Sequence, residues 1–135
     1  MEYTITLRNT TDEITRLQAF VEEVGEAFEL PIKVVMNLTL VLEEAVTNVI
    51  MYAYPKGENE HIYLTAKKQD GKLVFVLTDS GKAFDPTQTP EADISLSADE
   101  RQIGGLGIFL IRKIMNEVKY ERIDDKNVLT LEKEL

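Results

Sequence analysis

The chain has 135 residues, which corresponds to one domain at the usual size of about 100–200 residues per domain. It carries 15 Lys and Arg against 24 Asp and Glu, a formal net charge of −9, with one histidine and no cysteine. A surface this acidic argues against nucleic acid and anionic membrane as partners, because both need a basic footprint. The lack of cysteine excludes disulfides, thiolate metal sites and a cysteine nucleophile. The N-terminus lacks the basic start of a signal peptide, so we expect a cytoplasmic protein.

The chain begins with a predicted strand and helix. Apolar and polar residues alternate over residues 3–8, which is the period of a half-buried strand. Thr10 and Glu13 then stand three residues apart, the spacing of a capping box at a helix N-terminus. Apolar residues recur at helical spacing over residues 14–28, with charged residues between them. The pattern predicts an amphipathic helix with one buried face.

A second, more apolar helix is predicted to begin at Pro31, a position that tolerates proline. Residues 32–52 are apolar on nearly all sides of a helical wheel, which is typical of a buried central helix. A membrane span of about 20 residues has the same length. The carboxylates of Glu43 and Glu44 would make membrane insertion costly, so we expect a core helix instead.

The middle of the chain predicts a hairpin and a long loop. Asp70-Gly71 is a hairpin turn signal between two stretches of strand pattern, residues 62–66 and 72–78. Residues 80–103 have no clear period and hold two prolines and several acidic residues. Loops of this length inside a compact domain are usually functional or mobile.

The last third predicts a helix and a second hairpin. The glycines of residues 104–107 begin the helix, and the hairpin has its turn at residues 124–127. Two hairpins make the sheet at least partly antiparallel, and three helices most simply cover one of its faces. The predicted fold is therefore a single-domain, two-layer α/β sandwich over residues 1–135.

A polar pair stands out on the apolar second helix. Glu44 and Asn48 lie four residues apart, so they share one helix face. A buried carboxylate is costly unless something uses it. The pair can hold a hydrated Mg²⁺ ion and orient a hydroxyl group or a water molecule. The alternative is a polar stripe at the edge of the core that neighbouring groups or water satisfy.

Two further patches follow along the chain. Asp79 directly follows a buried strand and can accept a hydrogen bond from the amino group of a base, while Gly81 allows a positive φ or a close approach to a ligand. The alternative for this patch is an ordinary turn. Residues 104–107 offer glycine N–H groups to an anion at a helix N-terminus. A flexible hinge before a helix is the alternative, and the pattern is not a Walker A motif.

In their order and spacing the three patches resemble the Bergerat-type ATP site of the GHKL superfamily, which includes gyrase, heat-shock chaperone ATPases, mismatch-repair ATPases and histidine kinases. Within it, they resemble the anti-sigma-factor serine/threonine-protein kinase family (RsbW/SpoIIAB type). Residues 44–48 are similar to its N box, residues 79–85 to its G1 box and residues 104–111 to its G2 box. The resemblance runs from about Val34 to Leu131. It implies a mixed, largely antiparallel sheet covered on one face by about three helices.

The resemblance implies roles for the polar residues, with ATP and Mg²⁺ as cofactors. Glu44 would be the general base, and Asn48 would coordinate the Mg²⁺ ion that bridges the ATP phosphates. Asp79 would bind the adenine amino group, and Gly81 would shape that pocket. Thr130 on the last strand would approach the adenine.

The resemblance also implies how the phosphates are bound. Residues 86–103 would form the ATP lid. Lys82, Arg101 and Arg112 are the cations that could offset the phosphate charge, with Arg101 as the preferred partner of the γ-phosphate; solvated surface charge is the alternative reading. The G2 box would bind ATP through Gly104, Gly105, Leu106 and Gly107, with Gly105 and Gly107 cradling phosphates by their backbone N–H groups.

Three functions remain open on the sequence. The resemblance implies an anti-sigma factor that phosphorylates a serine of a STAS-type anti-anti-sigma protein and binds a sigma factor. The alternative is a nucleotide-gated switch without phosphoryl transfer, since Ala83 stands where the family commonly has a glycine. The catalytic part of a histidine kinase is disfavoured, because the only histidine, His61, lies in a predicted strand. The first strand and helix would form a homodimer interface by resemblance, or simply pack on the sheet.

Overall fold

The structure is a computed structural model that describes residues 2–54, 60–88 and 105–135. The helices and strands follow one another in the order expected from the sequence. In chain order the elements are β1 (Glu2–Arg8), the 3₁₀ turn η1 (Thr11–Glu13), α1 (Ile14–Ala27), α2 (Ile32–Asn48), the π-helical turn η2 (Val49–Ala53), β2 (His61–Gln69), β3 (Lys72–Asp79), the 3₁₀ turn η3 (Pro86–Gln88), α3 (Gly105–Ile114), β4 (Glu117–Ile123) and β5 (Lys126–Glu134).

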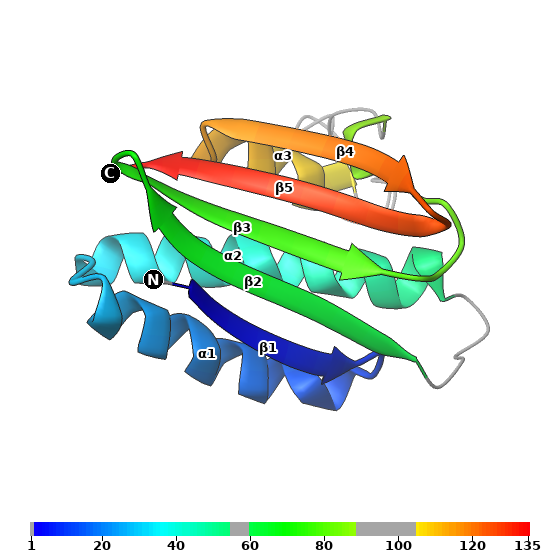
Figure 1. Cartoon of the computed structure of the whole chain (residues 1–135), viewed down its shortest axis with the longest axis horizontal. Coiled ribbons are helices and arrows are strands. Elements are labelled where there is room, and N and C mark those ends of the chain that lie inside the picture. Colours follow the sequence, from blue (N-terminus) through cyan, green and yellow to red (C-terminus); the bar gives the residue numbers. More distant parts are fainter. Residues whose placement is uncertain (1, 55–59, 89–104) are drawn as a thin grey trace.

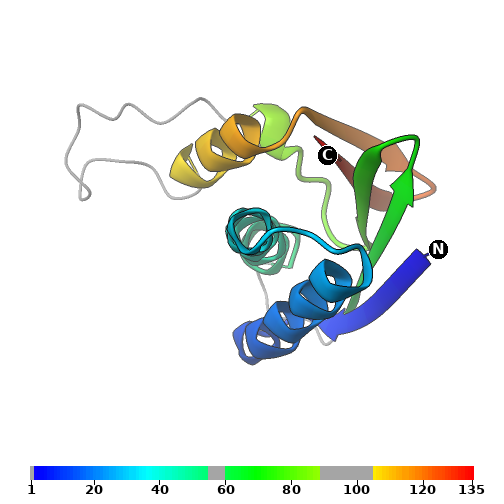
Figure 2. The same ribbon diagram turned by 90° about the vertical axis from the view of Figure 1, so that its left-hand side faces the viewer.

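The five strands form one sheet in the order β1-β2-β3-β5-β4. Each neighbouring pair is antiparallel, so the described sheet is fully antiparallel rather than mixed. The three helices lie on one face of this sheet, with α2 between α1 and α3, as the two views show (Figure 1, Figure 2). The predicted two-layer α/β sandwich is confirmed.

The core lies between the sheet and the helix layer. Side chains from both layers are fully buried there, among them Leu42 of α2, Phe75 of β3 and Ile108 of α3. Within the described residues, the helix over Ile32–Ala53 is the one that is long and apolar enough to cross a bilayer. Its Leu38, Leu42 and Val46 belong to the core cluster, which explains its apolar character by packing.

The first strand is tied to the first helix by Glu13, but not through the predicted capping box. Thr10 makes no side-chain cap bond, and a 3₁₀ turn precedes α1. The Glu13 carboxylate is buried and accepts hydrogen bonds from the Arg8 backbone N–H at 2.9 Å and from Arg16 Nη1 at 2.8 Å. The Arg8 hydrogen bond is the main cause that lowers the pKa of Glu13, with Arg16 adding to it.

Each hairpin turns through two residues with left-handed backbone. The φ angles are 53° and 75° at Asp70 and Gly71, and 50° and 62° at Asp124 and Asp125. Two-residue turns of this kind match the twist of the strands that they join. The second turn is therefore tighter than the predicted 124–127, and Asn127 already belongs to β5, where it pairs with Asp79 of β3.

The chain itself packs β1 and α1 onto the sheet. β1 pairs with β2 along its whole length, and α1 packs against α2 and β1. Tyr3 of β1 makes an edge-to-face contact with Phe28, just after α1, at a ring-centroid distance of 5.5 Å. A homodimer interface on these elements stays a prediction.

Candidate active site

At one end of the molecule α2 and β3 end and β5 begins (Figure 1). Residues of these elements line a pocket. Apolar side chains such as Ala45, Leu77 and Leu129 make up most of its lining. Asn48, Asp79, Tyr120 and Asn127 supply the polar groups. A mostly apolar pocket with a few converging polar groups is the usual form of a small-molecule site.

Asn48 brings an unpaired amide into this pocket. Its side chain is 5% exposed, and it makes no hydrogen bond to any residue that the structure describes. A buried amide without a partner costs about 1–3 kcal/mol. Asn48 is therefore a buried polar group that a ligand in the pocket can satisfy.

The helix widens directly after Asn48. Residues Val49–Ala53 form a π-helical turn, and the N–H of Tyr54 donates to the Val49 carbonyl at 3.2 Å. Such turns occur frequently at functional sites. Here the turn directs the Ala53 carbonyl towards the segment after β3, where it accepts the N–H of Lys82 at 2.8 Å.

Asp79 presents a carboxylate on the opposite wall of the pocket. It is 2% exposed, and its Oδ1 accepts the N–H of Gly81 and the Nδ2–H of Asn127, each at 2.9 Å. Its other oxygen accepts no hydrogen bond from the described residues. Burial raises the pKa of Asp79, against the opposing effects of Asn127, Gly81 and the Arg122 guanidinium. One oxygen thus positions the loop, and the other is available to a donor in the pocket.

Gly81 is required by close approach rather than by a positive φ. Its φ lies outside the left-handed region, but a Cβ at this position would lie 2.5 Å from the Ala53 carbonyl oxygen. Beside it, the N–H of Ser80 donates to the Tyr54 hydroxyl at 2.9 Å. These contacts join the loop after β3 to the end of α2.

Asn127 holds the other side of this loop, and the sequence analysis missed it. Its Nδ2 donates to Asp79 Oδ1 and to the Lys82 carbonyl, each at 2.9 Å. Its Oδ1 accepts the N–H of Phe84 at 3.2 Å and the hydroxyl of Tyr120 at 2.5 Å. One side chain therefore makes four hydrogen bonds that position the carboxylate and the loop together.

We expect Asn127→Ala to destabilise the fold by about 2–4 kcal/mol, because it leaves several partly buried groups unpaired. Asn116→Ala is the matched control. Asn116 Oδ1 accepts a single exposed hydrogen bond from the Glu134 N–H at 2.8 Å, so its loss should cost about 1 kcal/mol or less. Urea unfolding of both variants measures the difference. Equal losses would mean that the Asn127 network contributes little.

Comparison with known proteins identifies the family. The family model described as "Histidine kinase-like ATPase domain" matches residues 7–133. The chain belongs to this family. The match includes the α2, β3 and β5 segments that form the pocket.

Curated relatives of this ATPase domain include named kinases and anti-sigma factors. The chain is 30% identical over 131 residues to "Serine/threonine-protein kinase BtrW" of Bordetella bronchiseptica, covering 97% of this chain and 89% of that protein. It is 25% identical over 83 residues to "Anti-sigma F factor" of Shouchella clausii, covering 62% of this chain. The chain spans little more than half of that second relative, 57%.

A solved structure shares the fold of this ATPase domain. "The crystal structure of the RsbU and RsbW domains of Rv1364c from Mycobacterium tuberculosis" superposes with a TM-score of 0.72 at 15% identity. The superposition covers all of this chain and 32% of that one. The likeness supports the assignment of the fold.

Glu44 lies outside the pocket lining but next to it. It stands one helical turn before Asn48 and is half-buried. It makes no hydrogen bond or ion pair within the described part of the chain. Its carboxylate is therefore not committed to a described structural contact.

The predicted position of Thr130 has to be corrected, because the fold does not bring this residue to the pocket. Leu129 and Leu131 point into the core, so Thr130 between them points to the opposite face of the sheet. There it lines a separate surface hollow with Val74 and Lys119. Thr130 therefore does not lie in this pocket, to whose lining β5 contributes Asn127 and Leu129.

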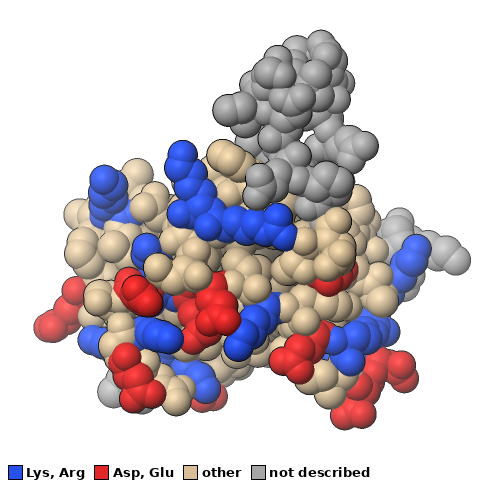
Figure 3. Space-filling model, turned by 90° about the horizontal axis from the view of Figure 1, so that it is seen from above, with Lys and Arg blue, Asp and Glu red and all other residues tan. Residues whose placement is uncertain are grey.

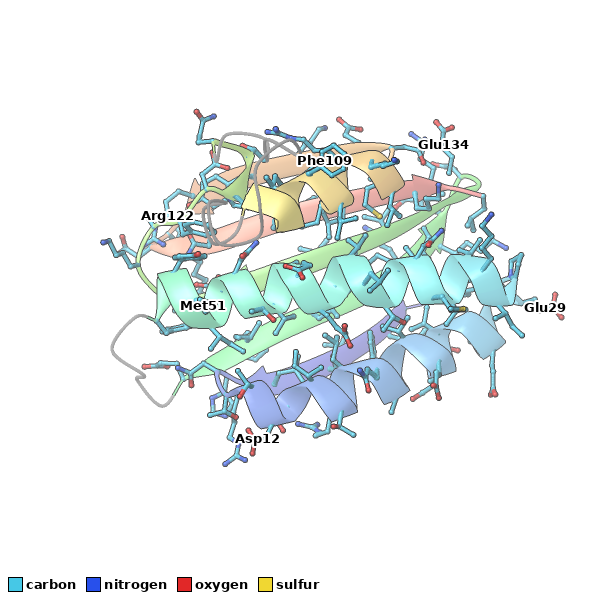
Figure 4. All side chains as sticks on the ribbon, turned by 180° about the vertical axis from the view of Figure 1, so that it is seen from behind. Asp12, Glu29, Met51, Phe109, Arg122 and Glu134 are labelled. Atoms are coloured by element: carbon cyan, nitrogen blue, oxygen red, sulfur yellow. The ribbon has the colours of Figure 1, made fainter. Side chains whose placement is uncertain are left out.

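Basic side chains gather around the loop after β3. Arg122 of β4, labelled in Figure 4, donates from Nη1 to the Gly81 carbonyl at 2.9 Å. Arg112 of α3 donates to the Thr87 carbonyl in η3, and Lys82 is exposed. Seen from above, over β4 and α3, Lys and Arg lie among Asp and Glu rather than in one acidic field (Figure 3). The sequence analysis did not single out Arg122.

The predicted phosphate-binding end is described in part. α3 begins at Gly105, so the backbone of Gly105, Leu106 and Gly107 forms its first turn. α3 begins at the same end of the molecule as the pocket (Figure 1, Figure 4). Of the predicted lid, Pro86–Gln88 form η3. Gly104, Arg101 and residues 89–103 lie outside the described residues.

Proposed function

We propose that this ATPase domain is an ATP-dependent serine kinase that phosphorylates an anti-anti-sigma protein and binds a sigma factor as an anti-sigma factor. The observation that carries the proposal is the pair of buried polar groups, Asn48 and Asp79, which face one apolar pocket with hydrogen-bonding capacity left over. The names of the BtrW and anti-sigma F relatives support the substrate class and the partners.

Adenine recognition falls to Asp79 in this proposal. The free carboxylate oxygen accepts a hydrogen bond from the exocyclic amino group of adenine, while Oδ1 keeps its bonds to Gly81 and Asn127. Apolar side chains such as Leu77 and Leu129 contact the faces of the base. A base without an amino group at that position leaves the other oxygen of this buried carboxylate unpaired, which disfavours such a base.

Phosphate binding falls to Asn48 and the start of α3. In the described part of the chain no cluster of three or more His, Cys, Asp or Glu could hold a metal ion. The unpaired carboxamide of Asn48 offers a hard oxygen ligand that would hold Mg²⁺ beside the phosphates. When bound, Mg²⁺ neutralises phosphate charge. The N–H groups of Gly105 and Gly107 donate to phosphate oxygens at a helix N-terminus.

Phosphoryl transfer falls to Glu44 as general base. Its carboxylate takes the proton of the substrate serine hydroxyl. The serine oxygen then forms its bond to the γ-phosphorus, and the bond to the bridging oxygen of ADP breaks. A carboxylate free of structural partners suits this role, because it can turn towards the hydroxyl group of a docked protein.

The test is incubation of the purified chain with γ-labelled ATP, Mg²⁺ and a purified STAS-type protein from the same organism. We expect label on a serine of the STAS-type protein and a complex with a sigma factor in pull-down. ATP binding with no phosphoserine would replace the kinase by the nucleotide-gated switch. Absence of ATP binding in calorimetry would overturn both.

A further inference from the structure

A groove separates the end of α1 from the start of α2, at the opposite end of α2 from the nucleotide pocket (Figure 4, near the label Glu29). We call it the α1–α2 groove. The groove has a volume of about 430 Å³, and its floor is apolar. Three glutamates stand on its rim, and all three are exposed. The floor comprises Gly25, Leu30, Ile32, Val35 and Met36, and the rim comprises Glu22, Glu26 and Glu29.

The groove follows from a close contact between the two helices. A Cβ on Gly25 would lie 2.5 Å from Val35 Cγ2, so only glycine allows this approach. Glu29 then adopts a left-handed φ of 55°, and the N–H of Leu30 donates back to the Gly25 carbonyl at 2.9 Å. α1 therefore stops sharply, and its last turn stands beside the first turn of α2.

An exposed apolar row continues from the groove along α2. The exposed fractions are 78% for Ile32, 63% for Met36 and 47% for Leu40. Each step of four residues rotates about 40° around the helix, because four residues exceed one turn of 3.6. The same row reaches Glu44, which is half-buried, and Asn48, which is 5% exposed. The row thus winds from solvent into the nucleotide pocket.

We propose that the α1–α2 groove and this row form the docking surface for a basic, amphipathic helical segment of a protein partner. Large exposed apolar side chains in a continuous patch mark interaction sites on soluble proteins. Anchors spaced at i and i+4 fit a partner helix that lies in a groove, and a methionine adapts to different partner side chains. The proposal does not depend on kinase activity, since docking needs neither ATP nor Glu44.

The three rim glutamates decide which occupant fits. A second copy of this chain seated on the same surface would bring six glutamate carboxylates together, which is repulsive. Residues 89–104 carry four acidic side chains and one basic side chain, so they are repelled too. An anionic membrane is repelled for the same reason. A helix with lysine or arginine beside its apolar face meets complementary charge along the α1 side of the groove.

The experiment measures anisotropy of a fluorescent peptide of about 18 residues, with Leu at helical spacing on one face and Lys elsewhere. We expect saturable binding to the full chain that weakens with salt. A peptide with Glu in place of every Lys should not bind. A scrambled Leu/Lys peptide, with the same charge but no apolar face, should bind at least about tenfold more weakly.

Variants of the protein distinguish peptide binding at this surface from non-specific electrostatic attraction to an acidic chain. Met36→Gln should weaken peptide binding about tenfold, whereas Ile123→Gln, on an apolar residue of β4 that is 44% exposed, should not. Glu26→Lys should weaken binding severalfold, whereas the same charge change in Glu121→Lys on β4 should change it less than about twofold. ATP affinity, measured alongside, should stay unchanged in all four.

Several results would overturn the proposal. Equal effects of the groove and β4 variants would mean non-specific electrostatic attraction. Concentration-dependent self-association that Met36→Gln removes, seen by sedimentation, would identify a second copy as the occupant. Binding to phosphatidylcholine vesicles with no binding to the Leu/Lys peptide would identify a lipid surface.

Discussion

Asp79→Asn is expected to lose ATP binding while the protein stays folded. The carbonyl oxygen of the new amide takes over the bonds from Gly81 and Asn127, because both donors point at Oδ1. The NH₂ group then replaces the free carboxylate oxygen and faces the adenine amino group, donor against donor. We expect affinity for ATP to fall on the order of 100-fold, measured by calorimetry.

The same variant should be at least as stable as the natural chain at neutral pH. Burial raises the pKa of Asp79, so the ionised carboxylate is less favourable in the folded than in the unfolded protein. The stability that its protonated form contributes is complete below the unfolded-state pKa and is lost as the pH rises through the folded-state pKa. Asparagine has no such dependence. Urea unfolding across this pH range measures the free energy of unfolding of both chains. The variant should become more stable relative to the natural chain as the pH rises.

Asp85→Asn is the matched control for both measurements. Asp85 Oδ1 also accepts a backbone N–H two residues on, that of Thr87 at 2.8 Å, but Asp85 does not line the pocket. The control loses the same charge and should bind ATP within about twofold of the natural chain. If Asp79→Asn kept full affinity, or if both variants lost it equally, Asp79 would not be the base-binding group.

Glu44→Gln is expected to keep ATP binding and to lose phosphoryl transfer. The carboxylate has no described structural partner, so removing its charge costs the fold little. A general base contributes about 10²–10⁴-fold to such a reaction. The rate of labelled phosphate transfer to the partner protein should fall by at least about 100-fold, with calorimetric ATP affinity unchanged.

Glu43→Gln is the control for this second prediction. Glu43 is the neighbouring carboxylate on α2, but its Oε1 accepts a hydrogen bond from Gln18 Nε2 of α1 at 2.5 Å. It is committed to helix packing, so its variant should transfer phosphate at nearly the natural rate. Transfer by Glu44→Gln at the rate of the Glu43→Gln control would remove Glu44 from the mechanism.

Much of the fold was predictable because its signals are local. The two-residue period of β1 and β2, the continuous apolar run of β3, the apolar pattern of α2 and the Asp70-Gly71 turn each identify one element from a few neighbouring residues. The role of Glu13 was not predictable in this way. Whether its carboxylate caps Thr10 or accepts the Arg8 N–H depends on where β1 ends relative to α1, and the tertiary arrangement decides that.

The site residues likewise differ in whether local sequence or tertiary arrangement determines their place. Asn48 and Asp79 each carry a local signal, a polar residue on an apolar helix and an acid at the end of a strand, and the structure brings both to one pocket. Thr130 and Asn127 depend on strand register. In the pairing of β5 with β3, Asn127 lies opposite Asp79 and Thr130 lies opposite Val76, on the other face of the sheet. A shift of one residue would exchange these two faces, and no short run of neighbouring residues encodes that register.

Because α2 is one continuous helix from Ile32 to Asn48, the docking row and the nucleotide pocket share a single rigid element. Binding free energies around a closed thermodynamic cycle must sum to zero. Any factor by which nucleotide changes partner affinity at one end is therefore the factor by which the partner changes nucleotide affinity at the other. A docked partner that changed nucleotide affinity tenfold would correspond to about 1.4 kcal/mol of coupling between the two ends of α2.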